Sequence, residues 1–236
     1  MTTDLTQAFL KAVELIVTLD PEVMGITFLS LRVSLTAVAL ASLVGMPAGV
    51  LLGTKDFMGK RVVQTLVNTG MAFPPVVMGL LVFLLFSNSG PLGPLNLLLT
   101  ESVMIIAQLL LAIPILTGLT AGAVANLDPR MSEVALTLGA SPVQRLCMVL
   151  RETRVALLAA MIASFGAAIS EIGAVQIVGG NIRYKTRTLT TAVGKEISAG
   201  RWEAALALGI ILLGTALATN IILTYLQHSQ RLLRSD

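Results

Sequence analysis

Five long stretches of this chain carry almost no charge, and this pattern constrains the fold more than any other feature. They cover residues 33–54, 62–86, 102–127, 155–182 and 204–227, and only the fourth contains a charged residue, Glu171. A helix of about 20 apolar residues crosses the roughly 30 Å of hydrocarbon in a bilayer. We therefore expect an all-α, polytopic membrane protein with about five transmembrane helices, forming a single membrane domain over residues 1–236.

The composition agrees with a membrane protein and gives little support to several other classes. Charged residues make up 12% of the chain, against about 25% in an average soluble domain. The net charge is only +3, and the basic residues lie mostly at the ends of apolar runs, so we expect no nucleic-acid partner. A single histidine excludes a multi-histidine metal site, and a single cysteine excludes an internal disulfide.

Residues 1–32 precede the first predicted span and mix charged with apolar positions. Lys11 and Glu14 interrupt an otherwise apolar segment from Leu5 to Leu19. We interpret residues 1–32 as an N-terminal interfacial region, whose amphipathic helix ends at Asp20-Pro21. A sixth, shorter span is the alternative.

Basic residues between the spans predict the orientation, because cytoplasmic loops carry an excess of Lys and Arg. One side of the membrane would hold Lys55, Lys60, Arg61, Arg130, Arg145, Arg151, Arg154, Arg231 and Arg234. We expect this side to be cytoplasmic, with the N-terminus outside and the C-terminus in the cytoplasm. The loop before the last span breaks the rule, since it would place five basic residues outside: Arg183, Lys185, Arg187, Lys195 and Arg201.

Residues 128–154 form a polar break between the third and fourth spans. Asp128-Pro129 predicts a helix start, and Gly139 predicts its end. Ser141-Pro142-Val143-Gln144 has the spacing of a capping box, which would start a second helix. The first helix carries an apolar stripe at helical spacing, formed by Met131, Val134, Ala135 and Leu138. We predict two short cytoplasmic helices that bind a partner; an interfacial hairpin without a partner is the alternative.

Three prolines and one carboxylate interrupt the spans. Pro74-Pro75 and Pro114 break the helical hydrogen-bond ladder, which is tolerated where the backbone lines a cavity or packs within protein. These prolines are therefore either pathway-lining residues or kinks that serve packing. Glu171 would lie about 25 Å of helix rise beyond Arg154, near the outer end of the hydrocarbon. For Glu171 we favour pairing with Arg32 or an outer-loop arginine over direct gating.

The polar break also resembles a known family. Glu133-Val134-Ala135-Leu-Thr-Leu-Gly139 is similar to the Glu-Ala-Ala-x-x-x-Gly signature of importer permeases in the ATP-binding-cassette (ABC) superfamily. Two positions depart from the family pattern, Val134 in place of alanine and Arg151 in place of a frequent proline. The resemblance implies a coupling helix that docks on a cytoplasmic ATPase, where Glu133 would pair with a basic residue or cap the local turn. The implied coupling residues are Glu133, Val134, Ala135, Gly139, Ala140, Ser141 and Pro142.

The segment after Glu171 suggests a cargo. Residues 170–174, 178–182 and 186–192 resemble the matching stretches of molybdate and tungstate importer permeases, and Val178-Gly179-Gly180-Asn181 is more similar to the tungstate branch. The resemblance implies import of an oxyanion, with tungstate first and molybdate or another oxyanion as the alternative. The pathway or gate candidates are Pro74, Pro75, Glu171, Asn181, Arg183, Thr186, Arg187 and Thr188. The five outer basic residues would attract the oxyanion or an acidic partner, or form a solvated loop.

The same resemblance implies the partners. We expect a homodimer in a bacterial or archaeal cell membrane, with two ATPase subunits in the cytoplasm and a solute-binding protein outside. The chain has no Gly-x-x-x-x-Gly-Lys-Ser/Thr loop, so we expect no catalytic residue and no cofactor in it, and ATP and magnesium on the ATPase. A secondary transporter or channel and a membrane scaffold are the alternatives. A secondary transporter would need an internal repeat or a row of ionisable groups in the spans.

Overall fold

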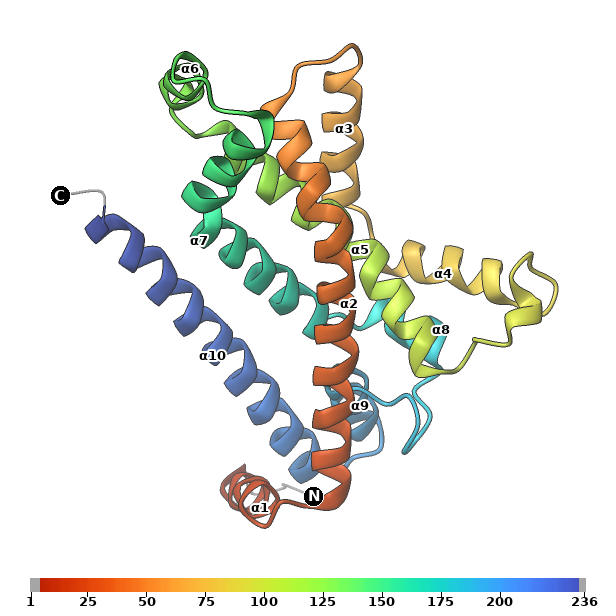
Figure 1. Ribbon diagram of the computed structural model, residues 1–236. Helices are drawn as coiled ribbons and strands as arrows, with labels where there is room; N and C mark the ends of the chain where they lie inside the picture. Colours follow the sequence, from red (N-terminus) through yellow and green to blue (C-terminus); the bar gives the residue numbers. More distant parts are fainter. Residues whose placement is uncertain (1–4, 234–236) are drawn as a thin grey trace.

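The computed structural model describes residues 5–233, and within them every regular element is helical (Figure 1), as predicted. Arg234, which enters the orientation argument, lies outside the described residues. The elements are α1 (Leu5–Val17), α2 (Pro21–Thr54), α3 (Lys60–Met71), α4 (Pro75–Phe86), a 3-10 turn η1 (Gly93–Leu95), α5 (Glu101–Ala125), α6 (Pro129–Thr137), α7 (Pro142–Ile169), α8 (Gly173–Gly179), α9 (Leu189–Ser198) and α10 (Trp202–Leu233). By length and hydropathy, α2, α5 and α10 can each cross a membrane, and the bent pairs α3–α4 and α7–α8 make up to five spans.

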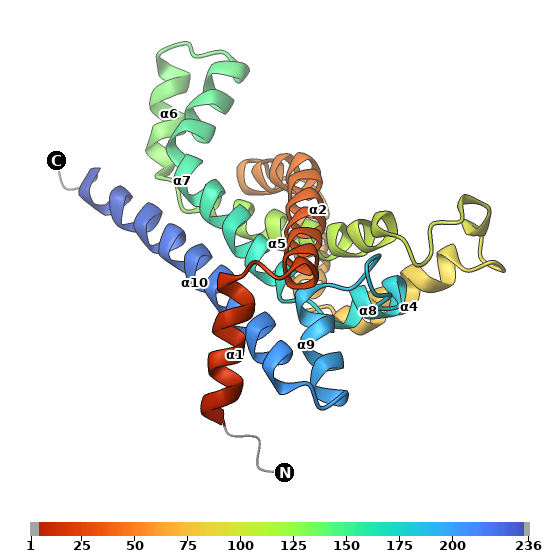
Figure 2. The same ribbon diagram turned by 90° about the horizontal axis from the view of Figure 1, so that it is seen from below.

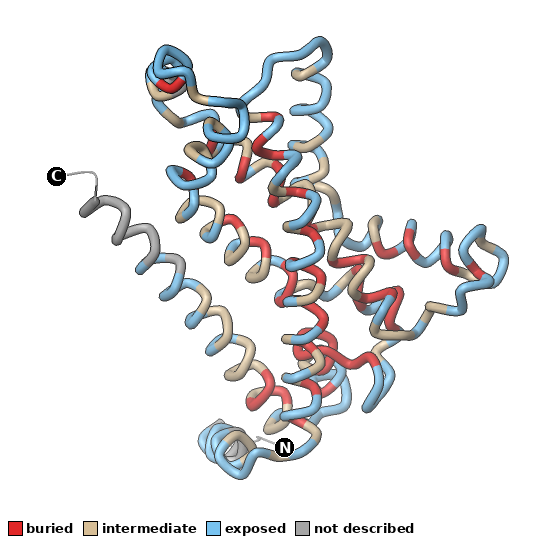
Figure 3. Tube along the Cα trace, viewed as in Figure 1, coloured by how far each residue is buried: buried red, intermediate tan, exposed pale blue. Residues whose placement is uncertain are grey.

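The molecule has two ends, which we name the α6 end and the α9 end. In Figure 1 the α6 end also holds the last turns of α2 and the start of α3, whereas α1, α9 and the start of α2 lie at the α9 end. Figure 2 shows α4 projecting to one side of the α2–α5 pair and α6 projecting to another. Buried residues follow α2 and α5 and gather around α8 and α9, whereas α1 and α3 are largely exposed (Figure 3).

The first span begins earlier than predicted. An Asp20 carboxylate oxygen accepts the backbone N–H groups of Glu22 and Val23 at 3.0 and 3.1 Å, and Pro21 occupies the first helical position. This capping starts a new helix at once. The interfacial assignment of residues 1–32 is therefore wrong in its second part, because α1 ends at Val17 and residues 21–32 belong to α2.

Two predicted spans are bent instead of continuous. Residues 62–86 divide into α3 and α4, which meet at 97°, because Pro74 and Pro75 supply no backbone N–H to continue the ladder. Residues 155–182 divide into α7 and α8, which meet at 57°. The second helix of the polar break is not short, since α7 runs from Pro142 to Ile169 without a further proline to end it.

A stripe of glycines holds α2 against α5. Gly45, Gly49 and Gly53 are spaced four residues apart and face Leu116, Thr120 and Val124 of α5. A Cβ atom at Gly49 would lie 2.5 Å from the Thr120 Cβ and 2.6 Å from the Thr117 carbonyl oxygen. Small residues at this spacing let helices in a membrane approach backbone to backbone. The α2–α5 pair therefore forms the closely packed centre against which the bent spans are placed.

Candidate functional site

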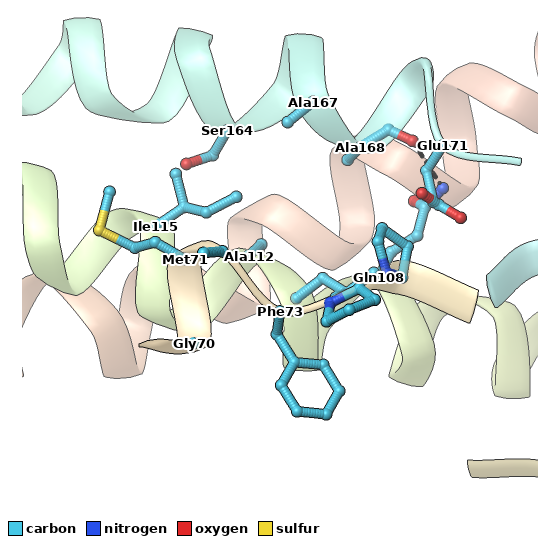
Figure 4. Close-up of a pocket in the computed structure, with 14 residues that line it drawn as sticks. Gly70, Met71, Phe73, Gln108, Ala112, Ile115, Ser164, Ala167, Ala168 and Glu171 are labelled. Atoms are coloured by element: carbon cyan, nitrogen blue, oxygen red, sulfur yellow. Dashed lines mark hydrogen bonds between the residues drawn. The ribbon is translucent and has the colours of Figure 1, made fainter. Parts of the chain in front are cut away.

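A pocket of about 340 Å³ lies where the two helix breaks meet the middle of α5. The break between α3 and α4 contributes Pro74 and Pro75, the last turns of α7 contribute Ser164, and the break between α7 and α8 contributes Glu171. Gln108 of α5 completes its polar lining (Figure 4), and the Phe73 ring extends away from Ser164 and Glu171. The structure thus brings together three of the predicted pathway residues, Pro74, Pro75 and Glu171.

Two buried polar side chains of this pocket lack a complete set of hydrogen bonds. The Gln108 Nε2 group donates to the Ala168 carbonyl oxygen at 2.8 Å, but its Oε1 atom has no partner among the described residues. The Ser164 hydroxyl is equally buried and also has no partner there. A buried polar group without a partner raises the free energy of the folded state, so a hydrogen-bonding partner would stabilise both groups. Neither residue was predicted from the sequence, although a glutamine in an uncharged span was a visible signal.

Glu171 does not form the ion pair that we favoured. Its Oε1 atom accepts the backbone N–H of Ala174 at 2.7 Å, so the carboxylate caps the first turn of α8. Its carbonyl oxygen accepts the Thr190 hydroxyl at 2.9 Å, which ties the break to α9. Arg32 pairs with Glu101 instead. The pairing prediction was wrong because the helix breaks at Glu171, and the broken helix leaves N–H groups for the carboxylate to accept.

The other predicted pathway residues form a separate framework in the loop between α8 and α9. The Thr186 hydroxyl donates to the Gly179 carbonyl oxygen at 2.5 Å and accepts the Ile182 N–H at 3.0 Å. Asn181 donates to the Thr191 carbonyl oxygen at 3.1 Å. Thr188 begins α9 through a reciprocal cap with Thr191. These residues shape the loop and do not line the pocket.

Carboxylates pair with three of the five basic residues in the segment 181–201. Glu22 accepts Arg183 Nε at 2.8 Å and lies 3.5 Å from Arg187 Nη1. Glu196 accepts Arg201 Nη2 at 3.0 Å and lies 3.9 Å from the same Arg187 atom. The hydrogen bond to Glu22 raises the pKa of Arg183, and the hydrogen bond to Glu196 raises that of Arg201, so both remain cations.

This pairing changes both interpretations of the five basic residues that were predicted to lie outside. Lys185 and Lys195 are exposed, whereas Arg183, Arg187 and Arg201 are committed to carboxylates. Carboxylates therefore balance three of the five positive charges that were expected to attract an oxyanion. The alternative of a solvated loop does not agree with the structure, because the Arg187 side chain is only 4% exposed. Its guanidinium also donates to Asn181 Oδ1 at 3.2 Å, so Arg187 joins the loop to α2 and α9.

The hairpin of α6 and the start of α7 has the predicted caps. Asp128 accepts the Arg130 N–H at 2.9 Å, and Ser141 and Gln144 form the reciprocal capping box. Gly139 has a φ of +75°, a left-handed conformation that favours glycine. Capping by Asp128 and Ser141 leaves Glu133 exposed and free of the local capping role.

The predicted apolar stripe of α6 is split between two environments. Ala135 is buried, whereas Val134 and Leu138 are exposed, Leu138 to 81%. Leu136 and Val143 add to the exposed apolar surface. Exposed apolar residues grouped on a projecting hairpin are typical of a surface that binds another protein.

Comparison with known proteins identifies the class. Residues 45–232 match the family described as "Binding-protein-dependent transport system inner membrane component", and the chain belongs to this family. It is 43% identical to the "Probable anion ABC transporter permease protein" of Haloferax volcanii, over 84% of this chain and 88% of that protein. It is 40% identical to the "Tungstate uptake system permease protein TupB" of Peptoclostridium acidaminophilum, over 95% of this chain and 98% of that protein. The chain is thus an ABC transporter permease subunit, not an enzyme.

A solved structure supports the fold independently. The chain is similar to a subunit in the inward-facing structure of the MetNI methionine ABC transporter, with a TM-score of 0.65 and 15% identity over 96% of this chain and 99% of that one. At this identity the match concerns the helix arrangement alone.

Proposed function

We propose that this chain is the membrane permease of an ATP-driven importer that carries tungstate. The observation that carries the proposal is the 40% identity to a tungstate uptake permease over nearly the full length of both chains. The 43% identity to a probable anion permease agrees with the same cargo class. Molybdate or another oxyanion is the alternative cargo, because selectivity is expected to reside mainly in a separate solute-binding protein.

In this proposal the α6 end faces the cytoplasm and the α6–α7 hairpin docks on an ATPase. Seven basic residues at this end support the orientation: Lys55, Lys60, Arg61, Arg130, Arg145, Arg151 and Arg154. Among the five basic residues in the segment 181–201, three are held by Glu22 and Glu196, which is consistent with their presence on the outer side. The N-terminus is then outside, the C-terminus is cytoplasmic, and the solute-binding protein docks at the α9 end.

The transport cycle uses two copies of the chain and two ATPase subunits. ATP and magnesium bind to the ATPases, and their closure draws the two hairpins together. We assign coupling to the exposed residues Val134 and Leu138 and to the turn at Gly139, which fixes the angle between α6 and α7. Closure would then move the pocket at Pro74-Pro75 and Glu171 between inward and outward access, because α7 connects the hairpin directly to Glu171.

Uptake of radioactive tungstate in cells that lack the permease gene tests this proposal. We expect the intact gene to restore uptake, with excess unlabelled tungstate abolishing it and excess sulfate leaving it unchanged. Molybdate competition measures how narrow the selectivity is. Restored uptake of sulfate or molybdate without tungstate uptake would assign another cargo, and no uptake of any oxyanion would contradict the importer itself.

A further inference from the structure

A second hollow, distant from the pocket at the helix breaks, lies between the last turns of α2 and the first half of α7. It is a groove of about 670 Å³ at the α6 end. Its walls are apolar and are formed mainly by Met46, Val50, Leu51, Leu146, Val149 and Leu150. Lys55 and Arg145 also line it, and no acidic residue in the described part of the chain does.

Lys55 and Arg145 give this groove a positive charge that no acidic residue in the described part of its lining balances. Arg145 is half-buried, and its Nε–H group is shielded from solvent without an acceptor among the described residues. The first turn of α7 also faces the groove through Pro142 and Val143, and a helix N-terminus carries a partial positive charge. Two cations that line one groove, with no acidic residue among the described lining residues, favour an anionic occupant.

The position of the groove along the span specifies the kind of anion. Val50 and Leu51 lie in the last turns of a candidate span, and Lys55 is the first charged residue after it. Charged residues that flank a span lie at the level of the lipid headgroups, and the apolar residues before them lie at the level of the acyl chains. A small inorganic anion would occupy only the charged part and leave the apolar walls uncovered.

We propose that this groove binds one anionic glycerophospholipid. The phosphate contacts Arg145 and Lys55, and an acyl chain lies between α2 and α7. Basic pockets between membrane helices are suited to anionic lipids in this way. The site is independent of the cargo and of the residues at the helix breaks.

Native mass spectrometry tests the proposed contact between the lipid phosphate and the basic residues of the groove. The full-length protein is released from bilayers that contain equal amounts of phosphatidylglycerol and phosphatidylcholine. We expect selective retention of one phosphatidylglycerol, reduced roughly fivefold by Arg145→Gln. Arg61→Gln is the matched control, because it removes the same charge from an exposed position at the same end outside the groove. Equal retention of the two lipids, or an equal loss in both variants, would overturn the proposal.

Two tryptophan variants test the apolar part while preserving every charge. Leu146 lines the groove and Leu158 does not, although both side chains are on α7 and each residue is 46% exposed. We expect Leu146→Trp to reduce phosphatidylglycerol retention and Leu158→Trp to leave it unchanged. Unchanged retention in Leu146→Trp, or expulsion of the lipid when the ATPase or a second copy binds, would show that the groove has another occupant.

Discussion

Gly49 illustrates how a single missing side chain sets the centre of the molecule. A Cβ atom there would overlap Thr120 and the Thr117 carbonyl oxygen, so we predict that Gly49→Ala lowers the stability by about 1–3 kcal/mol. Gly122→Ala is the control, since a Cβ atom at Gly122 would have no neighbour within 4 Å. Thermal unfolding of the purified variants in detergent measures both. A Gly49→Ala midpoint equal to that of Gly122→Ala would mean that α2 and α5 can separate without cost.

Arg187 is a residue whose charge is structural. Because it is buried between Glu22 and Glu196, removing its charge leaves both carboxylates short of a partner. We predict that Arg187→Gln lowers stability by about 3 kcal/mol, whereas Lys185→Gln, at an exposed position of the same loop, changes it by less than about 0.5 kcal/mol. Chemical denaturation of both variants provides the comparison, and similar losses would show that burial of Arg187 is energetically neutral.

Residue-level prediction from the sequence succeeded where the chemistry was local. The caps at Asp128, Ser141 and Gly139 depend on neighbours within three or four positions, so their spacing was sufficient. Glu171 accepts the N–H of Ala174, only three positions away, because the helix breaks there. Arg183 was different, because its partner depends on folding: it pairs with Glu22, 161 positions away. No spacing rule reaches that far, and the charge balance of the α9 end could be assigned only from the structure.

At the scale of elements, the α6–α7 hairpin provides a testable surface. Leu138 is 81% exposed and Met58, in the loop before α3 at the same end, is fully exposed. We predict that Leu138→Asp abolishes co-purification of the ATPase, because it places a charge in the proposed interface, whereas Met58→Asp preserves it. Both substitutions are at the surface and should leave the melting temperature unchanged. If the two variants co-purify equal amounts of ATPase, this face of α6 does not contact the ATPase.

The break between α3 and α4 is the second element with a specific consequence. We predict that replacing Pro74 and Pro75 together by alanine reduces uptake roughly tenfold or more, because the added N–H groups favour a continuous helix and close the pocket. Pro91→Ala, in an exposed loop, is the control. The measurement is uptake per amount of membrane-inserted protein. Normal uptake by the double variant would show that the prolines are kinks that serve packing alone.

Element boundaries show which part of this geometry the sequence contains. Pro74-Pro75 predicted a break in the helix, but the 97° angle between α3 and α4 depends on how α4 packs against α8 and α5. Gly79 is part of that contact, since a Cβ atom there would lie 2.6 Å from the Ala174 Cα. Asp20-Pro21 was correctly interpreted as a boundary, yet the start of the first span was placed at Val33. The predicted span was an uncharged run and so began after Arg32, whereas the folded chain pairs Arg32 with Glu101 and Glu22 with Arg183.

At the scale of the whole molecule, the outward apolar face of α10 bears on the number of copies. Leu213, Leu217 and Ile221 recur every four residues and are exposed, so this stripe contacts lipid or another chain. The proposed transport cycle uses two copies of the chain, and we predict a complex with two permeases and two ATPases. Native mass spectrometry of the purified transporter measures this composition directly. A complex with one permease whose ATPase still responds to the tungstate-loaded binding protein would show that a single chain encloses the pathway.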